Sequence, residues 1–302
     1  SHSDCLKHVT SPAHPESPRR LSAIEDRFLE TGLSDVLTYV DAPEVCRDHL
    51  LRVHTPRHVQ MVETMTPSNG YVNLDPDTIM CPESLTAARR AAGAVTAAVD
   101  LVVSGKMSSA FCGVRPPGHH AESGRAMGFC LFNNIAVGAA HALQEHGMNR
   151  VAIVDFDVHH GNGTEEIFEN EPSVLFCSTY QHPFFPFTRQ LEDAPNRISI
   201  PLDATAKSPE FRAAVVDHWL PALQSFEPEL VFVSAGFDAH VDDDMSNVSL
   251  TDADFRWVTE QIVDIAAKSA SGRVISVLEG GYELNSLARC AEQNVRILLG
   301  LH

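Results

Sequence analysis

The stretch Val151-Ala152-Ile153-Val154-Asp155-Phe156-Asp157-Val158-His159-His160-Gly161 decides how this chain folds. Its four leading residues form a continuous apolar run, which is typical of a buried parallel strand. Side chains alternate between the faces of a strand, so Asp155, Asp157 and His159 are expected to leave its end in one direction. Buried carboxylates and an imidazole need a cation or hydrogen-bond partners to offset their desolvation. The stretch therefore predicts a metal site at the end of a central strand.

A simpler interpretation of the same stretch needs no metal. Residues 164–168 resemble the start of a helix, and Asp155 or His159 could serve as its cap. The metal interpretation is preferred on these residues alone, and polar clusters from other loops strengthen it.

Composition limits the function classes. With 302 residues, 44% of them hydrophobic, the chain can form one large domain over residues 1–302. A net charge of −18 argues against binding to nucleic acid and favours cationic partners. Seven scattered cysteines without a Cys-x-x-Cys pair indicate a reducing compartment, so a cytoplasmic location is expected. We find no apolar stretch long enough for a membrane span and no signal peptide, and therefore expect no membrane association.

Strands and helices alternate along the chain. Strands are predicted at 110–114, 151–154, 173–178, 230–234 and 274–278, and helices at 21–30, 84–104, 135–146, 210–226, 252–269 and 284–299. Pro221 is expected to kink its helix or end it early. This alternation predicts an α/β fold, a single domain with a mostly parallel central sheet and helices on both faces. Ligands bind beyond the carboxyl ends of the strands in such sheets.

Unusual polar clusters directly follow the predicted strands. They are Arg115-Pro116-Pro117-Gly118-His119-His120-Ala121-Glu122, the stretch from Asp155 to Gly161, Gly236-Phe237-Asp238-Ala239-His240 and Glu279-Gly280-Gly281-Tyr282. Catalytic zinc keeps three N or O ligands and one open position for water, and Asp157, His159 and Asp238 can supply the three. Two carboxylate ligands leave little net charge on the zinc ion and make it a weaker Lewis acid. Because its bound water is then less acidic, a general base is expected nearby to deprotonate that water.

The tandem histidines His119 and His120 fit the role of that base. A histidine base needs its second nitrogen held, and Asp155 and Asn162 can each hold one ring. A carboxylate raises an imidazole pKa more than an amide does, so the two rings should differ in protonation. We take His120 as the partner of Asn162 and as the base and proton donor, with His119 as the electrostatic partner. Tyr282 is expected to donate to the developing oxyanion.

Other loops allow more than one interpretation. The fragment 14–20 is equally consistent with a surface turn and with a loop on the active-site side. Phe184 and Phe185 either line a pocket or plug a loop, although Phe129 and Phe185 together would make apolar walls for a narrow tube. Such a tube suits a long, uncharged chain end such as an acylated lysine. The acidic run 242–244 is expected to be a solvated loop.

Together these motifs resemble the zinc-dependent histone deacetylase family, which has the arginase-deacetylase fold. The resemblance covers nearly the whole chain and rests on the clusters above, together with His14-Pro15-Glu16, Asp77-Thr78, Gly128-Phe129-Cys130 and Phe184-Phe185-Pro186. The sequences Arg-Pro-Pro-Gly-His-His-Ala-Glu and Leu-Glu-Gly-Gly-Tyr are similar to those of the class II branch and its bacterial histone deacetylase-like amidohydrolase relatives.

The resemblance implies a zinc ion on Asp157, His159 and Asp238, proton transfer by His119 and His120, and Tyr282 on the substrate carbonyl. It implies a substrate tunnel formed by Gly128, Phe129, Phe185, Gly280 and Met245. It also implies a structural potassium ion near Asp155, Asp157, His159, Ser178 and Thr179. Class IIa members carry histidine in place of Tyr282 and deacetylate poorly, so this chain is expected to be fully active.

The expected function is zinc-dependent hydrolysis of acetyl or short acyl groups from lysine side chains of peptides or proteins. Acetylpolyamine hydrolysis is the alternative. By this resemblance, Met245 occupies the position of the glutamate gatekeeper of the animal polyamine enzymes, and an apolar residue there favours an acyl-lysine substrate. The acidic net charge keeps acetylpolyamines as alternative substrates. An arginase-type ureohydrolase needs more aspartates, and a pure acyl-lysine binding module has no need of the histidine pair. The sequence leaves open the acyl length, the oligomeric state and the choice of zinc or iron.

Overall fold

Six parallel strands form the centre of the protein in this computed structural model, which describes residues 1–11, 13–187 and 194–301. The strands are β3 (Ser109–Cys112), β4 (Val151–Asp155), β5 (Val174–Gln181), β6 (Arg197–Leu202), β7 (Leu230–Ala235) and β8 (Val274–Leu278). Their order across the sheet is β3-β8-β7-β4-β5-β6. Because all six are parallel, their carboxyl ends meet at one edge of the sheet, and the loops that carry the predicted clusters start there.

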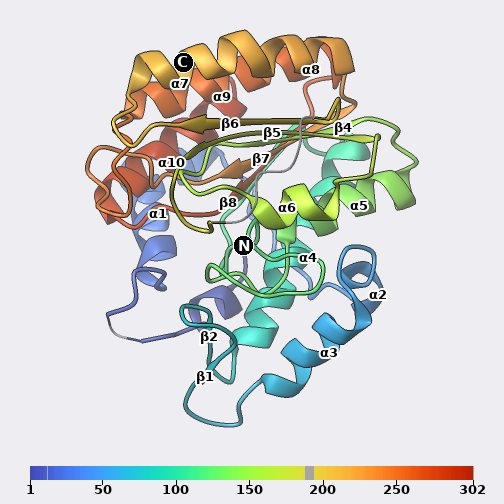
Figure 1. The fold of residues 1–302 in the computed structure, drawn as a ribbon, viewed down its shortest axis with the longest axis vertical. Helices are drawn as coiled ribbons and strands as arrows, with labels where there is room; N and C mark the ends of the chain where they lie inside the picture. Colours follow the sequence, from blue (N-terminus) through green and yellow to red (C-terminus); the bar gives the residue numbers. More distant parts are fainter. Residues whose placement is uncertain (12, 188–193, 302) are drawn as a thin grey trace.

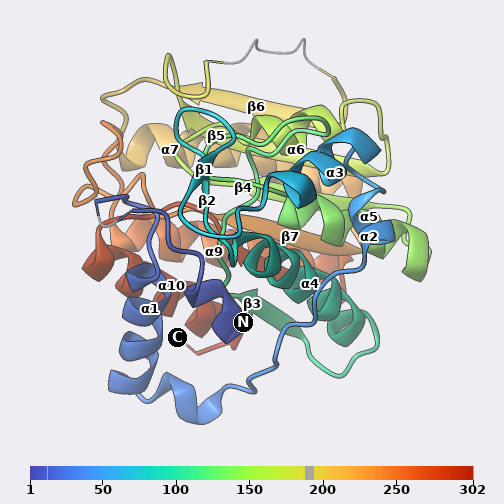
Figure 2. The ribbon, with the colours of Figure 1, turned by 90° about the horizontal axis from the view of Figure 1, so that it is seen from below.

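Helices cover both faces of this sheet, as Figures 1 and 2 show. They are α1 (Arg19–Glu30), α2 (Arg47–Leu50), α3 (Pro56–Met65), α4 (Ser84–Val103), α5 (Asn134–His146), α6 (Asn162–Ile167), α7 (Ser208–Ala214), α8 (Leu220–Phe226), α9 (Asp252–Ser269) and α10 (Leu284–Leu298). On one face α4 contacts β3 and β8, and α5 contacts β4 and β7. On the other face α7, α9 and α10 contact β6, β7 and β3, and α10 also packs on α1. A small antiparallel hairpin, β1 (Val72–Asn73) and β2 (Ile79–Met80), lies apart from the sheet. The expected α/β architecture is confirmed.

The central strand β4 is buried along its whole length, as its apolar run predicts. It pairs with β5 on one side and β7 on the other, so Asp155 at its end stands level with Ser178 and Ser234. Small residues let the covering helices approach closely. A Cβ atom at Gly138 of α5 would overlap Val95 of α4 and crowd Phe232 of β7.

Two elements differ from expectation. The strand β6 was not predicted from the sequence, and it contains Pro201, a residue that is rare in strand interiors. Pro201 is tolerated because β6 is an edge strand, which among the described strands pairs only with β5. The helical segment 208–226 is interrupted by a π-helix, Val215–Trp219, before α8 begins. Pro221 is the second residue of α8, directly after the π-helix, and the backbone remains helical up to and beyond it, so the expectation that Pro221 ends the helix early is wrong.

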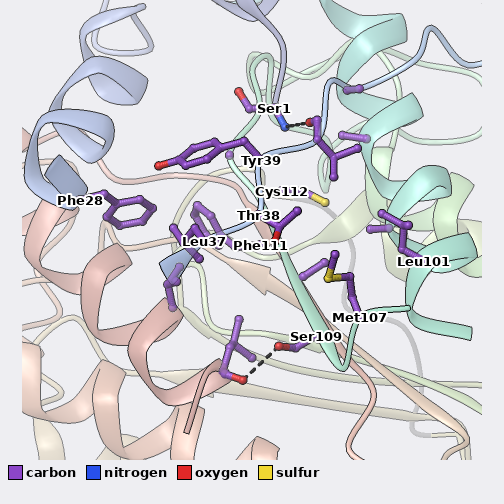
Figure 3. A pocket seen from close by; sticks show the side chains of 18 of the residues that line it. Ser1, Phe28, Leu37, Thr38, Tyr39, Leu101, Met107, Ser109, Phe111 and Cys112 are labelled. Carbon is purple, nitrogen blue, oxygen red and sulfur yellow. Dashed lines mark hydrogen bonds between the residues drawn. The ribbon is translucent and has the colours of Figure 1, made fainter. Parts of the chain in front are cut away.

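A cavity of about 250 Å³ lies beside the edge strand β3, between that strand, α1, α4 and α10. Figure 3 shows its mostly apolar lining, with Phe28, Leu37, Tyr39 and Phe111 around it. The predicted site residues are absent from this lining, so the cavity is separate from the candidate site. Among the helices of the described residues, we find none with both the length and the apolar character needed to cross a membrane.

We expect Phe232→Ala to lower the free energy of unfolding by about 3–5 kcal/mol, because the ring is fully buried beneath α5 and its removal leaves a cavity. Urea denaturation followed by circular dichroism measures the change. The control is Leu29→Ala in α1, whose side chain is 67% exposed and should change stability by less than about 0.5 kcal/mol. Equal effects of the two substitutions would contradict this account of the core.

Candidate active site

The loop after β4 turns its polar side chains inward by local hydrogen bonds. From the sequence, the strand pleat is expected to continue through Asp157 and His159, but β4 ends at Asp155. Instead, the Asp157 N–H donates to Asp155 Oδ1 (3.1 Å) and the His159 N–H donates to Asp157 Oδ1 (2.9 Å). Each carboxylate thus orients the residue two positions later, which is the bonding of an Asx-turn. The capping interpretation is wrong, since the N-cap of α6 is Gly161 and no side chain caps it.

Asp157, His159 and Asp238 converge in the structure. They are buried, and their candidate ligand atoms all lie within 4.8 Å of one another. His159 Nδ1 lies 3.1 Å from both Asp157 Oδ1 and Asp238 Oδ2. Backbone N–H groups of Gly280 and Val158 donate to the other oxygens, Asp157 Oδ2 (2.8 Å) and Asp238 Oδ1 (3.0 Å). The three side chains are therefore held in place before any ion binds.

The electrostatics of this group fit a divalent cation. Burial, and then the neighbouring charge of Asp157, raises the pKa of Asp238 to about 6. Two buried carboxylates this close repel each other, and a cation between them relieves that repulsion. Two carboxylate oxygens and one imidazole nitrogen form a donor set that catalytic zinc accepts. A Cβ atom at Gly236 would overlap the Asp157 carboxylate, and one at Gly280 would overlap both carboxylates, so glycine at these positions keeps the space open.

Two other groups of possible ligands occur among the described residues, Asp100/His141/His146 and His240/Asp252/Cys290. In each, one imidazole has the wrong tautomer for a metal. Arg52 donates to His141 Nδ1 (3.3 Å), and the Asp242 N–H donates to His240 Nδ1 (3.0 Å). A neutral ring that accepts at Nδ1 carries its proton on Nε2, the nitrogen that faces the carboxylates. The first group is better explained as a hydrogen-bonded cluster around Asp100. In the second, His240 Nε2 lies 3.6 Å from Asp252 Oδ2 and has no hydrogen-bond partner among the described residues.

The tandem histidines lie beside the cluster with their rings 4.0 Å apart. His119 Nδ1 is 3.0 Å from Asp155 Oδ2, and His120 Nδ1 is 2.9 Å from Asn162 Oδ1, so both expected pairs are present. The orientation of Asn162 is set by Glu122, whose Oε1 accepts from Asn162 Nδ2 (2.8 Å). The amide oxygen must therefore face His120, which donates from Nδ1 and keeps the lone pair of Nε2 free.

The two histidines differ in charge. Burial, and then the nearby charges of His119 and His159, lowers the pKa of His120 well below 6.5. Burial also opposes the charge on His119, but the carboxylates of Asp155, Asp157 and Glu279 outweigh it and raise its pKa to about 10. At neutral pH His120 is thus the neutral ring and His119 the charged one, the division expected from their partners.

Aromatic rings surround the cluster. Phe185 lies edge-on to His120 at 5.2 Å, and Phe184 stacks on His159 at 5.2 Å, so both phenylalanines line the site rather than plug a loop. Phe129 contacts Tyr282 at 6.0 Å.

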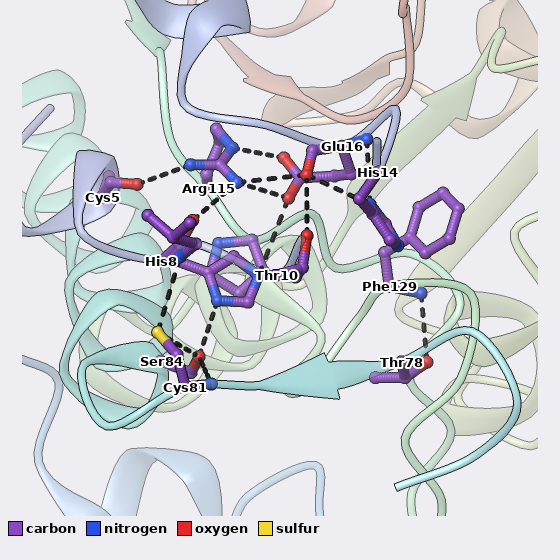
Figure 4. Close-up of polar contacts among 12 residues, drawn as sticks. Cys5, His8, Thr10, His14, Glu16, Thr78, Cys81, Ser84, Arg115 and Phe129 are labelled. Atoms are coloured by element: carbon purple, nitrogen blue, oxygen red, sulfur yellow. Dashed lines mark hydrogen bonds and ion pairs between the residues drawn. The ribbon is translucent and has the colours of Figure 1, made fainter. Parts of the chain in front are cut away.

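The fragment 14–20, which the sequence left open between a surface turn and an active-site loop, lies close to the ring of Phe129. Figure 4 shows His14 against Phe129, with 4.7 Å between their ring centres, so the fragment 14–20 lies on the active-site side. Gly128 has a positive φ of 55°, and a Cβ atom there would overlap the His120 ring.

Tyr282 is held as a neutral phenol. Burial, and then the charge of Asp238, raises its pKa well above 10. A neutral hydroxyl group is available as a hydrogen-bond donor to an oxygen that gains negative charge.

A second candidate cation position lies at Ser178. Ser178 stands beside Asp155 in the sheet, and its buried Oγ has no hydrogen-bond partner among the described residues. A buried hydroxyl oxygen without a partner, next to a carboxylate, is the environment that a bound potassium ion would satisfy. The adjacent Thr179, also buried, has its backbone in the same strand.

Sequence reasoning missed a buried ionic network behind the site, part of which is drawn in Figure 4. Glu16 accepts from Arg115 Nη2 (2.6 Å) and Arg20 Nη1 (3.2 Å). Arg20 also donates to the carbonyl oxygens of Gly281 (2.6 Å) and Glu279, and its guanidinium lies 5.0 Å from the centre of the Tyr282 ring. The network therefore supports the loop that carries Tyr282. The motif His14-Pro15-Glu16 marked the region, but no local pattern indicated that Arg20 is buried.

The expectation that residues 242–244 form a solvated loop is wrong for Asp243. Asp242 and Asp244 are exposed, while Asp243 is only 5% exposed. Asp243 is buried because its carboxylate accepts from the backbone N–H groups of Tyr282 and Glu283, which lie about forty positions further along the chain. Nothing in the run of three aspartates distinguishes the middle one.

Comparisons with known proteins match nearly the whole chain to proteins of one family. Residues 14–298 match the histone deacetylase domain family. Human polyamine deacetylase HDAC10 is 38% identical, over 94% of this chain and 44% of its own length. The histone deacetylase-like amidohydrolase of Pseudomonas aeruginosa is 35% identical, over 95% of this chain and 76% of its own. The crystal structure of the HDA15 HD domain matches with a TM-score of 0.93 at 35% identity, covering 99% of this chain and 87% of that one. This chain thus spans less than half the length of the human relative.

We expect Glu16→Gln to lower the free energy of unfolding at pH 7 by about 3–5 kcal/mol, because it leaves two buried guanidinium groups without their counter-charge. Burial works against the Glu16 charge, but Arg115 and Arg20 lower its pKa from 4.5 to about 2. A folded-state pKa below the unfolded one stabilises the protein above about pH 4.5, and this contribution is lost as the pH falls toward 2.

Urea denaturation at pH 7 and at pH 3 tests this prediction. The difference between wild type and Glu16→Gln should be smaller at pH 3, and the exposed control Glu30→Gln should stay near wild type at both pH values. A difference that grows on acidification would contradict the ionic account.

Proposed function

The chain belongs to the histone deacetylase family, and we propose that it is a zinc-dependent hydrolase that removes acetyl or short acyl groups from lysine side chains. The proposal treats residues 1–302 as one catalytic domain with the arginase-deacetylase fold. The observation that carries it is the convergence of Asp157, His159 and Asp238 beside His120, whose Nε2 keeps a free lone pair. A metal group with a neutral base at its side is the equipment for hydrolysing an unactivated amide.

Asp157, His159 and Asp238 would hold the zinc ion, one per chain. The bound ion would polarise the amide carbonyl and make water more acidic. A structural potassium ion is proposed at Ser178, Thr179 and the backbone of the loop after β4, where the unpartnered Ser178 hydroxyl supports it. Backbone oxygens of Asp155, Asp157 and His159 would complete that second site.

The chain's own residues divide the proton transfers. His120 Nε2 takes a proton from the attacking water and later returns it to the leaving amine, because its ring is neutral and its Nδ1–H is held by Asn162. His119 stays charged against Asp155 and stabilises negative charge as it develops. Tyr282 donates its hydroxyl proton in a hydrogen bond to the substrate oxygen. Gly128, Phe129, Phe185 and Gly280 would enclose the acyl-lysine stem.

Acetylpolyamine hydrolysis is the second candidate. The net charge of −18 attracts polycationic substrates, and the human relative is named a polyamine deacetylase. Met245, which stands at the proposed gate, offers no carboxylate for a second ammonium group and therefore favours acyl-lysine. We further propose that the protein works in the cytoplasm, as its seven free cysteines suggest, and that its partners are acylated peptides or proteins rather than nucleic acid or membranes.

The zinc-loaded protein should hydrolyse an acetyl-lysine peptide with a higher kcat/KM than acetylputrescine or acetylspermidine. Released acetate measures the three rates, with Tyr282→Phe as the matched variant that keeps the ring and loses the hydroxyl. A large excess on the amines would replace the first candidate with the second. If no substrate is hydrolysed by protein with one zinc per chain, the enzyme proposal is wrong.

His120→Ala should reduce kcat by about 10²–10⁴-fold, the usual contribution of a general base.

Asn162→Asp should move the acidic limb of the pH profile of kcat/KM to higher pH. A carboxylate beside Nδ1 raises the pKa of His120, so that its Nε2 is protonated at neutral pH and cannot act as a base. The control is Asn149→Asp, the same change at an exposed position, which should leave the profile in place. Near-normal turnover in His120→Ala together with an inactive His119→Ala would reverse the assigned roles.

A further inference from the structure

The loop that carries Tyr282 is held by charged side chains from other parts of the chain. It begins with Gly280 and Gly281, and Gly281 has a φ of 116°, which side-chain-bearing residues rarely adopt. Its carbonyl side is held by Arg20, as described above. Its amide side is held by Asp243 Oδ2, which accepts from the Tyr282 N–H (2.6 Å) and the Glu283 N–H (2.9 Å). The direction of the Tyr282 side chain therefore depends on a carboxylate from another loop.

The same carboxylate also binds its own loop. Asp243 Oδ1 accepts from the N–H of Met245 (3.1 Å), the first of residues 245–247, which we call the gate segment. In this segment Ser246 Oγ donates to the carbonyl of Asp238 (3.1 Å), and the Asn247 N–H donates to Gln181 Oε1 (2.8 Å). The gate segment is thus bonded directly to a proposed zinc ligand, and Asp243 links it to the tyrosine loop.

Burial makes these bonds strong. Asp243 is 5% exposed, and a carboxylate that accepts several N–H groups away from water gains more from each bond than an exposed one does. The two neighbouring aspartates are exposed, and Asp242 pairs with Arg289 (3.2 Å) at the surface. Within the run of three, only Asp243 reaches the tyrosine loop.

We propose that Asp243 is a positioning residue that holds Tyr282 and the gate segment in one arrangement, and so determines both turnover and the choice between substrates. This inference rests on the proposed function. Asp243 does not touch the reacting atoms; it acts on turnover through the place of the Tyr282 hydroxyl, and on selectivity through the place of Met245. A change at either loop is transmitted to the other through one carboxylate.

Asp243→Asn tests the inference, since it keeps the size of the side chain and one acceptor oxygen but removes the charge. On an acetyl-lysine peptide we expect kcat to fall at least tenfold at one zinc per chain. The ratio of kcat/KM between the peptide and acetylspermidine should change at least threefold. The matched control is Asp244→Asn, the same substitution at the exposed neighbour, which should stay within twofold of wild type in both measurements.

A double-mutant cycle separates positioning from general damage. If Asp243 affects kcat only through Tyr282, then adding Asp243→Asn to Tyr282→Phe should lower kcat by less than about threefold. The selectivity change should persist in that background, because it comes from the gate segment. A full tenfold further loss, or loss of zinc from Asp243→Asn alone, would overturn the inference.

Hydrogen exchange provides a readout that does not need activity. The amides of Tyr282 and Glu283 should exchange faster in Asp243→Asn than in wild type or Asp244→Asn, as measured by mass spectrometry of peptides covering residues 280–286. Unchanged protection would overturn the inference even in an active enzyme. An inactive wild type with faster exchange in Asp243→Asn would instead reject the proposed function and leave the structural coupling standing.

Discussion

Buried negative charge at the carboxyl edge of the parallel sheet is the constraint on which the rest of this structure depends. Asp155, Asp157, Asp238 and Glu279 are each no more than 1% exposed. Removing a carboxylate from water costs several kcal/mol unless other groups replace the lost hydration. Backbone N–H groups, two imidazoles and, in the proposed holoenzyme, a cation perform that replacement. The same groups are the ones that amide hydrolysis requires, so the compensation of buried charge and the equipment for catalysis coincide.

The local geometry follows from this constraint. The chain leaves β4 at Asp155 and turns so that successive N–H groups face successive carboxylates, which a continued strand would not allow. A side chain at Gly236 would overlap the Asp157 carboxylate, and one at Gly280 would overlap the carboxylates of both Asp157 and Asp238. Glu279 accepts from the N–H groups of Gly118 (2.7 Å) and His119 (3.1 Å), which ties the histidine loop to the end of β8. Its burial raises its pKa to about 7.

The tyrosine loop is held in a defined position by side chains from distant parts of the chain. Arg20 binds its carbonyl oxygens and Asp243 binds its N–H groups, so charges of opposite sign hold the two sides of the backbone. Neither residue belongs to the loop. Arg20 depends in turn on Glu16, which it shares with Arg115. The position of one phenol is thus set by contacts among four separate parts of the chain.

The sequence by itself determined the layered α/β architecture, the limits of α9 and β8, and the edge of the sheet at which the polar clusters gather. These depend on periodicity and on the rule that parallel strands share one carboxyl edge, both of which are local or topological. It also indicated the pairing of His119 with Asp155 and of His120 with Asn162. Only the tertiary structure decided that Pro201 lies in an edge strand, that Arg20 is buried and that Asp243 differs from its two neighbours. The physical reason is that burial of a charged side chain depends on which distant backbone groups pack against it. A local run of three aspartates does not indicate which of them will meet such groups.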